Sequence, residues 1–100
     1  MAITGAQARA ARALVQLPRD YVAKKACIDE AALGGFETGL GDLAGDDKAR
    51  LRRALEDGGA VFLPEDGAGG IGVRLKFTER DVRALGRLEG EGGPSGDDDV

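Results

Sequence analysis

The spacing of the apolar residues changes once along this chain, at Gly58 and Gly59. Before this glycine pair, apolar residues recur every three or four positions, as they do on one side of an amphipathic helix. After it, apolar and polar residues alternate, which is typical of a half-buried strand. A chain of 100 residues has room for one domain and one small core. We therefore expect a mainly α domain that ends in a β-hairpin.

The first predicted helix covers 5–17 and begins after Thr4, a residue type that caps helix N-termini. Arg9 and Arg12 fall together on one side of this helix. The other side carries apolar residues at helical spacing and is expected to face the core: Ala6, Ala10, Ala13, Leu14 and Leu17.

Three further helices complete the helical part. Pro18 suits the start of a helix over 19–26. Asp29 is a good N-cap for a helix over 29–37 that Gly39 ends, and Asp46 or Asp47 can cap a fourth helix. Their inward positions are the apolar residues at helical spacing: Val22, Ala26, Leu33, Phe36, Leu51 and Leu55.

The rest of the chain is predicted to hold a hairpin over 60–77, with strands at 60–63 and 71–77 and a polar, glycine-rich turn. Thr78 can cap a short added helix over 78–89. The final stretch, 90–100, lacks a run of apolar residues and reads as a disordered acidic tail. One domain over 1–89 followed by this tail is the expected organisation.

Composition argues against several classes of function. The chain has no histidine and one cysteine, so the usual metal ligands and general bases are missing and we expect neither an enzyme nor a cofactor. No run of about 18 apolar residues is present, so no membrane span is expected. A single cysteine cannot form an internal disulfide, which favours a cytoplasmic protein.

Charge is spread unevenly around the net value of −4. Residues 1–27 hold five basic groups and one acidic group, whereas residues 28–47 hold six acidic groups and no basic one. A global basic signature for nucleic acid is absent, although a local basic patch remains available near the N-terminus.

Several segments match a family pattern. "LPRDYVAKKACID" has apolar residues where the family has them in L-S-Q-x-x-L-A-x-x-A-G-V-S, and "IDEAALGGFETG" shares Glu37 and Gly39 with V-S-x-x-T-I-x-x-L-E-x-G. "LRRALEDGGAVFLPEDGAGGIGVRL" is similar to a helix followed by G-V-x-F and G-V-R-L. Residues 3–77 therefore resemble the XRE class of helix-turn-helix regulators, which have the lambda-repressor-like fold, in a short bacterial variant with an appended β-hairpin.

The resemblance implies transcriptional regulation, with the second helix of the pair placed to enter the DNA major groove. By position, the DNA-facing residues would be Arg19, Asp29, Glu30, Ala31, Ala32 and Gly35. The family has serine at position 29 and often basic or amide groups at 30, 31 and 35, and this chain has lost them. Carboxylates at the leading end of a helix oppose binding to phosphates, but they also serve as ordinary helix caps.

Two mechanisms follow. In the first, the protein binds another transcriptional regulator, as an antiactivator or co-regulator, through the outer face of the helix over 29–37. That face comprises Asp29, Glu30, Ala32, Gly34, Gly35 and Glu37. In the alternative, the protein is a dimeric DNA-binding repressor or autoregulator with candidate phosphate contacts at Arg9, Arg12, Arg19, Lys24 and Lys25.

The hairpin offers a further candidate surface. Two strands alone are marginally stable in water, so the apolar residues need a cover. A homodimer formed by strand pairing, a strand from another protein, or the added helix over 78–89 could supply it. The candidate pairing residues are Val61, Leu63, Val73 and Leu75.

Overall fold

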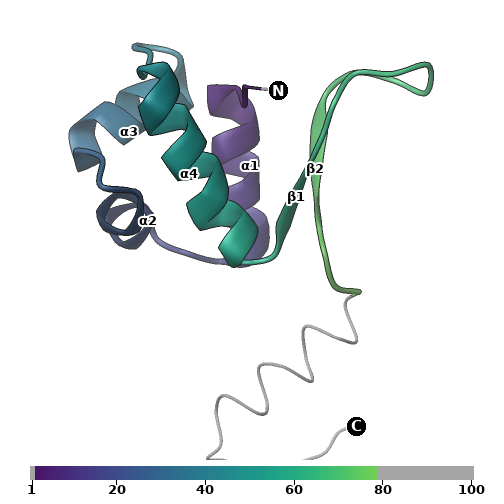
Figure 1. Ribbon diagram of the computed structural model, residues 1–100, viewed down its shortest axis with the longest axis horizontal. Helices are drawn as coiled ribbons and strands as arrows, with labels where there is room; N and C mark the ends of the chain where they lie inside the picture. Colours follow the sequence, from purple (N-terminus) through teal and green to yellow (C-terminus); the bar gives the residue numbers. More distant parts are fainter. Residues whose placement is uncertain (1, 79–100) are drawn as a thin grey trace, which may run out of the picture.

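The computed structural model describes residues 2–78. Within them, four helices lie together and a two-stranded antiparallel hairpin extends beside them (Figure 1). In chain order the elements are α1 (Gly5–Val15), α2 (Arg19–Ala26), α3 (Glu30–Thr38), α4 (Gly45–Asp57), β1 (Ala60–Leu63) and β2 (Gly72–Leu75). The expected mainly α domain with a hairpin is confirmed at this level. Apart from Thr78, the predicted helix over 78–89 and the acidic tail lie outside the described residues.

Helix α1 begins as predicted and ends earlier. The Thr4 hydroxyl accepts a hydrogen bond from the Gln7 backbone N–H at 3.1 Å, and the Gln7 side chain accepts one from the Thr4 N–H at 3.0 Å. This reciprocal pair satisfies two amides that the first turn leaves without partners. At the other end, Gln16 takes a left-handed conformation with φ 59°. The helix therefore stops at Val15, two residues before the predicted end.

The predicted inward side of α1 is wrong. Its buried residues are Gln7, Ala8 and Ala11, and the alanines predicted to face the core are exposed. Leu14 is 38% exposed. Small side chains on the true inward side let α1 approach α3 closely. At Gly5, an added Cβ would lie 1.9 Å from the backbone oxygen of Phe36, so no larger residue fits there without movement.

The inward positions predicted for the other helices are confirmed. Val22, Ala26, Leu33, Phe36, Leu51 and Leu55 are all buried and belong to one apolar cluster with Ala8, Ala11 and Phe62. Leu33, Leu51 and Leu55 have no exposed surface. Burying a leucine contributes roughly 1.5–3 kcal/mol, so these residues supply much of the apolar stabilisation of the helices.

Helix α4 begins two residues earlier than a cap at Asp46 would place it, and three residues earlier than a cap at Asp47 would. Ala44 occupies the N-cap position without a side-chain hydrogen bond, and Asp46 and Asp47 lie in the first turn. Their carboxylates act on the partial positive charge of the helix N-terminus rather than as caps. Gly58 is the C-cap, so the stop at the glycine pair is confirmed.

The hairpin packs one face on the helices and leaves the other outward. Its register pairs Ala60 with Leu75 and Phe62 with Val73, so these four side chains share a face. Ala60 and Phe62 are buried in the cluster, and β2 lies against α1. The Gln7 amide fixes this contact by donating to the Gly72 carbonyl oxygen at 2.9 Å. β2 is shorter than predicted at both ends.

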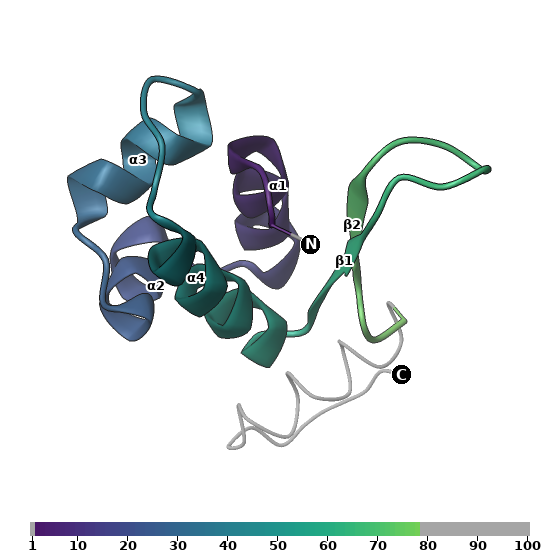
Figure 2. The ribbon, with the colours of Figure 1, turned by 45° about the horizontal axis from the view of Figure 1, so that its top comes forward.

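The loop between the strands projects away from the helices in both views (Figures 1 and 2). This loop is closed by hydrogen bonds between the backbones of Asp66 and Gly69. The Asp66 side chain also accepts from the Ala68 N–H at 2.8 Å. The strands thus carry a structured, polar tip beyond the helical body.

Candidate interaction surface on helices α2 and α3

Helices α2 and α3 are joined by a tight turn over 27–29. Cys27 ends α2 in a left-handed conformation with φ 58°, and its N–H donates to the carbonyl oxygens of Ala23 and Lys24. A non-glycine residue in this region is strained, because Cβ crowds the backbone. Ile28 packs partly against the core, so the turn is held from inside. This turn fixes the direction in which α3 leaves α2.

The leading end of α3 is acidic and exposed. The Asp29 carboxylate accepts a hydrogen bond from the Ala32 N–H at 3.1 Å, which confirms the predicted N-cap. Glu30, in the first turn, is exposed. Both carboxylates favour the helix through its unpaired amides and its dipole. At the same time they give the outer end of α3 a negative charge.

The rest of the outer face of α3 is small and uncharged. Ala31 and Ala32 are exposed, and Gly34 and Gly35 are half-buried. No basic residue occurs anywhere in α3. Leu40, just beyond the Gly39 cap, is 89% exposed, and the sequence reading gave it no role. A single exposed apolar side chain is common on protein surfaces, so Leu40 by itself does not define a binding site.

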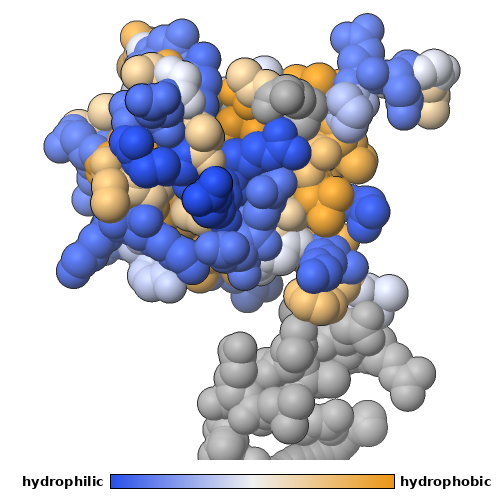
Figure 3. Space-filling view, in the orientation of Figure 1, coloured by the Kyte–Doolittle hydropathy of each residue, from blue (hydrophilic) through white to orange (hydrophobic). Residues whose placement is uncertain are grey.

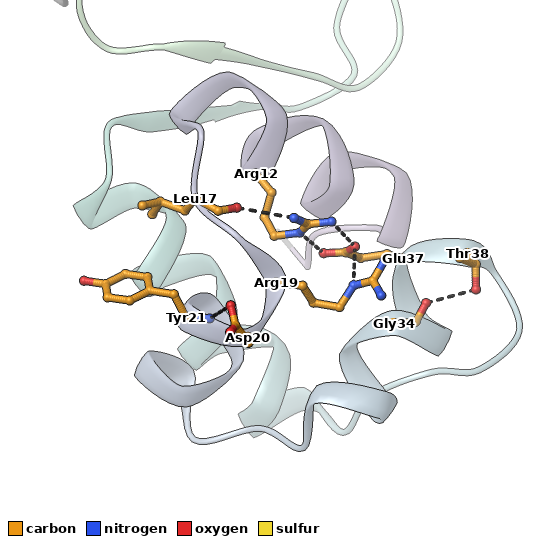
Figure 4. Close-up of polar contacts among 8 residues, drawn as sticks. All are labelled: Arg12, Leu17, Arg19, Asp20, Tyr21, Gly34, Glu37 and Thr38. Carbon is orange, nitrogen blue, oxygen red and sulfur yellow. Dashed lines mark hydrogen bonds and ion pairs between the residues drawn. The ribbon is translucent and has the colours of Figure 1, made fainter.

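Glu37 does not belong to this outer face, so its assignment to the partner-binding set is wrong. Its side chain has no exposed surface and forms ion pairs with two arginines, one from α1 and one from α2 (Figure 4). Arg12 donates from Nε and Nη2 to the two carboxylate oxygens at 2.6 and 2.8 Å. Arg19 donates from Nε at 3.3 Å. A buried carboxylate requires such partners.

Arg12 is therefore not placed for a phosphate contact. Its side chain is only 17% exposed, and its third nitrogen donates to the Leu17 carbonyl oxygen at 3.3 Å. The hydrogen bonds to Glu37 raise the pKa of the Arg12 guanidinium above its ordinary value. This arginine is a charged structural bridge between α1, the following loop and α3. The prediction that Arg12 contacts a DNA phosphate is therefore wrong.

Arg19 lies between the buried cluster and solvent. Its side chain is 39% exposed and crosses α3 at Gly34, where an added Cβ would lie 3.3 Å from the guanidinium. Gly34 thus leaves room for Arg19 to reach Glu37, which gives this helix-interior glycine a packing role. With two arginines and one glutamate, the cluster keeps one excess positive charge, on its solvent side.

The remaining basic residues are dispersed. Arg9 and Lys24 are exposed, and within residues 2–78 neither forms an ion pair. Lys25 lies 3.8 Å from the Asp57 carboxylate on α4. Of the five candidate phosphate contacts, Arg9 and Lys24 are the two fully available ones. They lie on α1 and α2, and neither lies on α3.

The four hairpin candidates divide between two faces. Val73 packs against the core cluster on the face that meets the helices, and Leu75 shares that face. Val61 and Leu63 lie on the opposite face and are partly exposed. Only the second pair is oriented outward for contact with another molecule through the sheet face.

Among residues 2–78, no group of three or more metal-ligating side chains lies together. Cys27 is a free, exposed thiol. None of the helices in this range has the length and apolar character needed to cross a bilayer. No protein-family model and no curated protein matches this chain.

Sequence reasoning missed two features of this surface. The Arg12–Glu37–Arg19 cluster joins residues 25 positions apart in sequence, and only the packing of three helices brings them together. The sequence gives no signal for this cluster, because an acidic residue on a helix is usually exposed. The exposure of Leu40 had no signal in the apolar spacing.

Proposed function

We propose that this chain is a small transcription-regulatory protein built on a helix-turn-helix frame of the lambda-repressor type, and that it acts by binding another regulator protein. The order of the helices, the tight turn between α2 and α3, and the hairpin after α4 support this frame. They are the features that the resemblance to XRE-class regulators leads us to expect.

The observation that carries the proposed mechanism is the character of α3. Its exposed side offers Asp29, Glu30 and alanines, and it has no basic group to neutralise a phosphate. The exposed Thr38 hydroxyl donates to the Gly34 and Gly35 carbonyl oxygens of the same helix. DNA affinity comes largely from Lys and Arg on phosphates. A helix with carboxylates at its leading end and the exposed Leu40 beyond its other end suits a protein surface that combines positive charge with apolar area.

A DNA-binding repressor is the second candidate, and one observation favours it. The cluster around Glu37 retains one excess positive charge at Arg19, and Lys24 is free on the same helix. Both lie on α2, where phosphate contacts are expected in a helix-turn-helix protein. This mechanism would use the two basic side chains for docking and would leave base reading to few contacts.

The test compares DNA and protein binding by the same full-length chain. Titration against random and genomic duplexes at about 20 mM salt, followed by salt increase, detects phosphate-driven binding through its steep salt dependence. We expect no binding at low micromolar protein. Tight binding that falls steeply with salt and is lost in Lys24→Ala would favour the repressor.

For the protein partner, the regulator captured by pull-down is purified and titrated directly. Glu30→Lys reverses an exposed charge on α3, and Asp29→Asn removes a charge while keeping a good N-cap. We expect Glu30→Lys to weaken the complex at least about ten-fold. Asp46→Lys is the matched control, because it reverses an exposed first-turn acid on α4. Equal effects of both reversals would contradict the proposal.

A further inference from the structure

The outward face of the hairpin has a regular arrangement that the proposed function does not use. Val61 pairs with Arg74 and Leu63 pairs with Gly72 on this face. Val61 and Leu63 are partly exposed, although the opposite face of the same strands is packed on the helices. Figure 3 shows apolar surface over the strands and hydrophilic surface at the projecting tip.

Charges of opposite sign mark the two ends of this hairpin. Glu65 and Asp66, at the tip, are exposed, and so are Arg74 and Lys76, toward the base. Within residues 2–78 none of the four forms an ion pair. The tip therefore carries two negative charges and lies beyond Leu63, whereas Arg74 lies level with Val61 and Lys76 lies one step further toward the base.

From this pattern we propose that the partner of the outward hairpin face is a second copy of this chain, packed antiparallel to the first about a two-fold axis. In that arrangement, Val61 and Leu63 of each copy cover those of the other. Glu65 and Asp66 of one copy come to lie near Arg74 and Lys76 of the other. Because the axis repeats each contact, both ends of the interface join opposite charges.

The alternative orientation fails on charge. A parallel stack of two hairpins would place acidic tip on acidic tip and basic base on basic base, and such juxtapositions are unfavourable. The antiparallel stack also covers Val61 and Leu63, which the helices leave partly exposed. The patch is small, so we expect a reversible dimer with a dissociation constant of roughly micromolar or weaker.

Sedimentation equilibrium of the full-length chain, from about 5 μM to about 1 mM, measures this association directly. Arg74→Glu with Lys76→Glu makes both ends of the hairpin acidic. Glu65→Lys with Asp66→Asn makes both ends basic or neutral and preserves an acceptor for the Ala68 N–H. We expect each variant alone to dissociate at least about ten-fold more readily than the wild type.

Mixing the two variants shows whether the weaker self-association of each variant comes from a loss of folding or from the loss of the contact between copies. A heterodimer again joins opposite charges at both ends, so we expect the mixture to associate at least about as tightly as the wild type. Arg53→Glu, an exposed reversal on α4, should leave self-association unchanged. Circular dichroism confirms folding of each variant. A wild type that stays monomeric up to about 1 mM, or a mixture that does not associate, overturns the proposal.

Discussion

Replacing Glu37 by glutamine tests whether the buried charge cluster holds α1, α2 and α3 together. The substitution keeps the shape of the side chain and removes its charge. Arg12 then loses its charged acceptor while remaining only 17% exposed, and Arg19, at 39% exposure, loses its ion pair but can turn to water. The loss of stability should therefore come mainly from the contact between Glu37 and Arg12.

The size of the effect follows from these exposures. Removing one partner of a buried ion pair costs about 3–5 kcal/mol, and a surface ion pair contributes about 0–1 kcal/mol. Because Arg12 retains some contact with water, we take the lower end and expect Glu37→Gln to lower the free energy of unfolding by about 3 kcal/mol. That is a large share of the roughly 5–15 kcal/mol that holds such a domain, and it should lower the melting temperature by roughly 12–24 °C.

Urea denaturation followed by circular dichroism measures the cost, with Glu30→Gln as the control on the same helix. Glu30 is exposed, so its substitution should stay within about 0.5 kcal/mol. Arg19→Ala should cost no more than about 1 kcal/mol, and Arg12→Gln combined with Glu37→Gln should cost clearly less than the sum of the two single changes. A loss below about 1 kcal/mol for Glu37→Gln, or additivity of the pair, would refute this reasoning.

Three further changes probe the backbone and the titration of the fold. Cys27→Gly should stabilise the protein by about 0.5–1 kcal/mol in urea denaturation, because position 27 has φ 58°; a loss of stability would contradict this. Gly5→Ala should destabilise by at least about 1–3 kcal/mol through its clash with the Phe36 carbonyl, whereas Gly45→Ala, with open space around it, should be neutral or stabilising; equal effects would contradict the clash. Asp42, whose pKa is lowered by the Leu43 N–H, contributes stability above its ordinary pKa of 3.8 that is lost as pH falls through its folded-state pKa. The stability advantage of the wild type over Asp42→Asn should therefore shrink between about pH 6 and pH 2 in melting experiments, and a constant difference would argue against the shift.

Helix positions could be predicted from local chemistry, because caps and stops act over a few residues. Thr4, Asp29, Gly39 and Gly58 each end or begin a helix where the sequence suggests. The inward side of α1 could not be predicted, because alanines occur on every side of it and give no clear periodicity. Its orientation is set instead by distant partners, through the hydrogen bond from Gln7 to β2 and the close approach to α3.

The exposed part of the candidate site could be predicted from the sequence, and its buried part could not. The acidic, small-residue face of α3 can be read from composition alone. The role of Glu37 cannot, since an acidic residue on a helix reads as surface until a buried cation is placed beside it. Here that cation comes from α1, and Arg12 lies 25 positions from Glu37 in sequence.

The Glu37 cluster also changes how the two proposed mechanisms should be weighed. Two of the five basic residues that could have held phosphates, Arg12 and Arg19, point toward a buried carboxylate of α3. The positive charge that would attract DNA is thus partly used in joining the helices, while Asp29 and Glu30 are exposed and form no ion pair within residues 2–78. A helix that draws its neighbouring arginines inward and presents carboxylates outward is poorly suited to a phosphate surface. The same arrangement leaves carboxylates at the leading end of α3 and the exposed Leu40 beyond its other end, and a protein surface that carries positive charge and apolar area can bind such a helix.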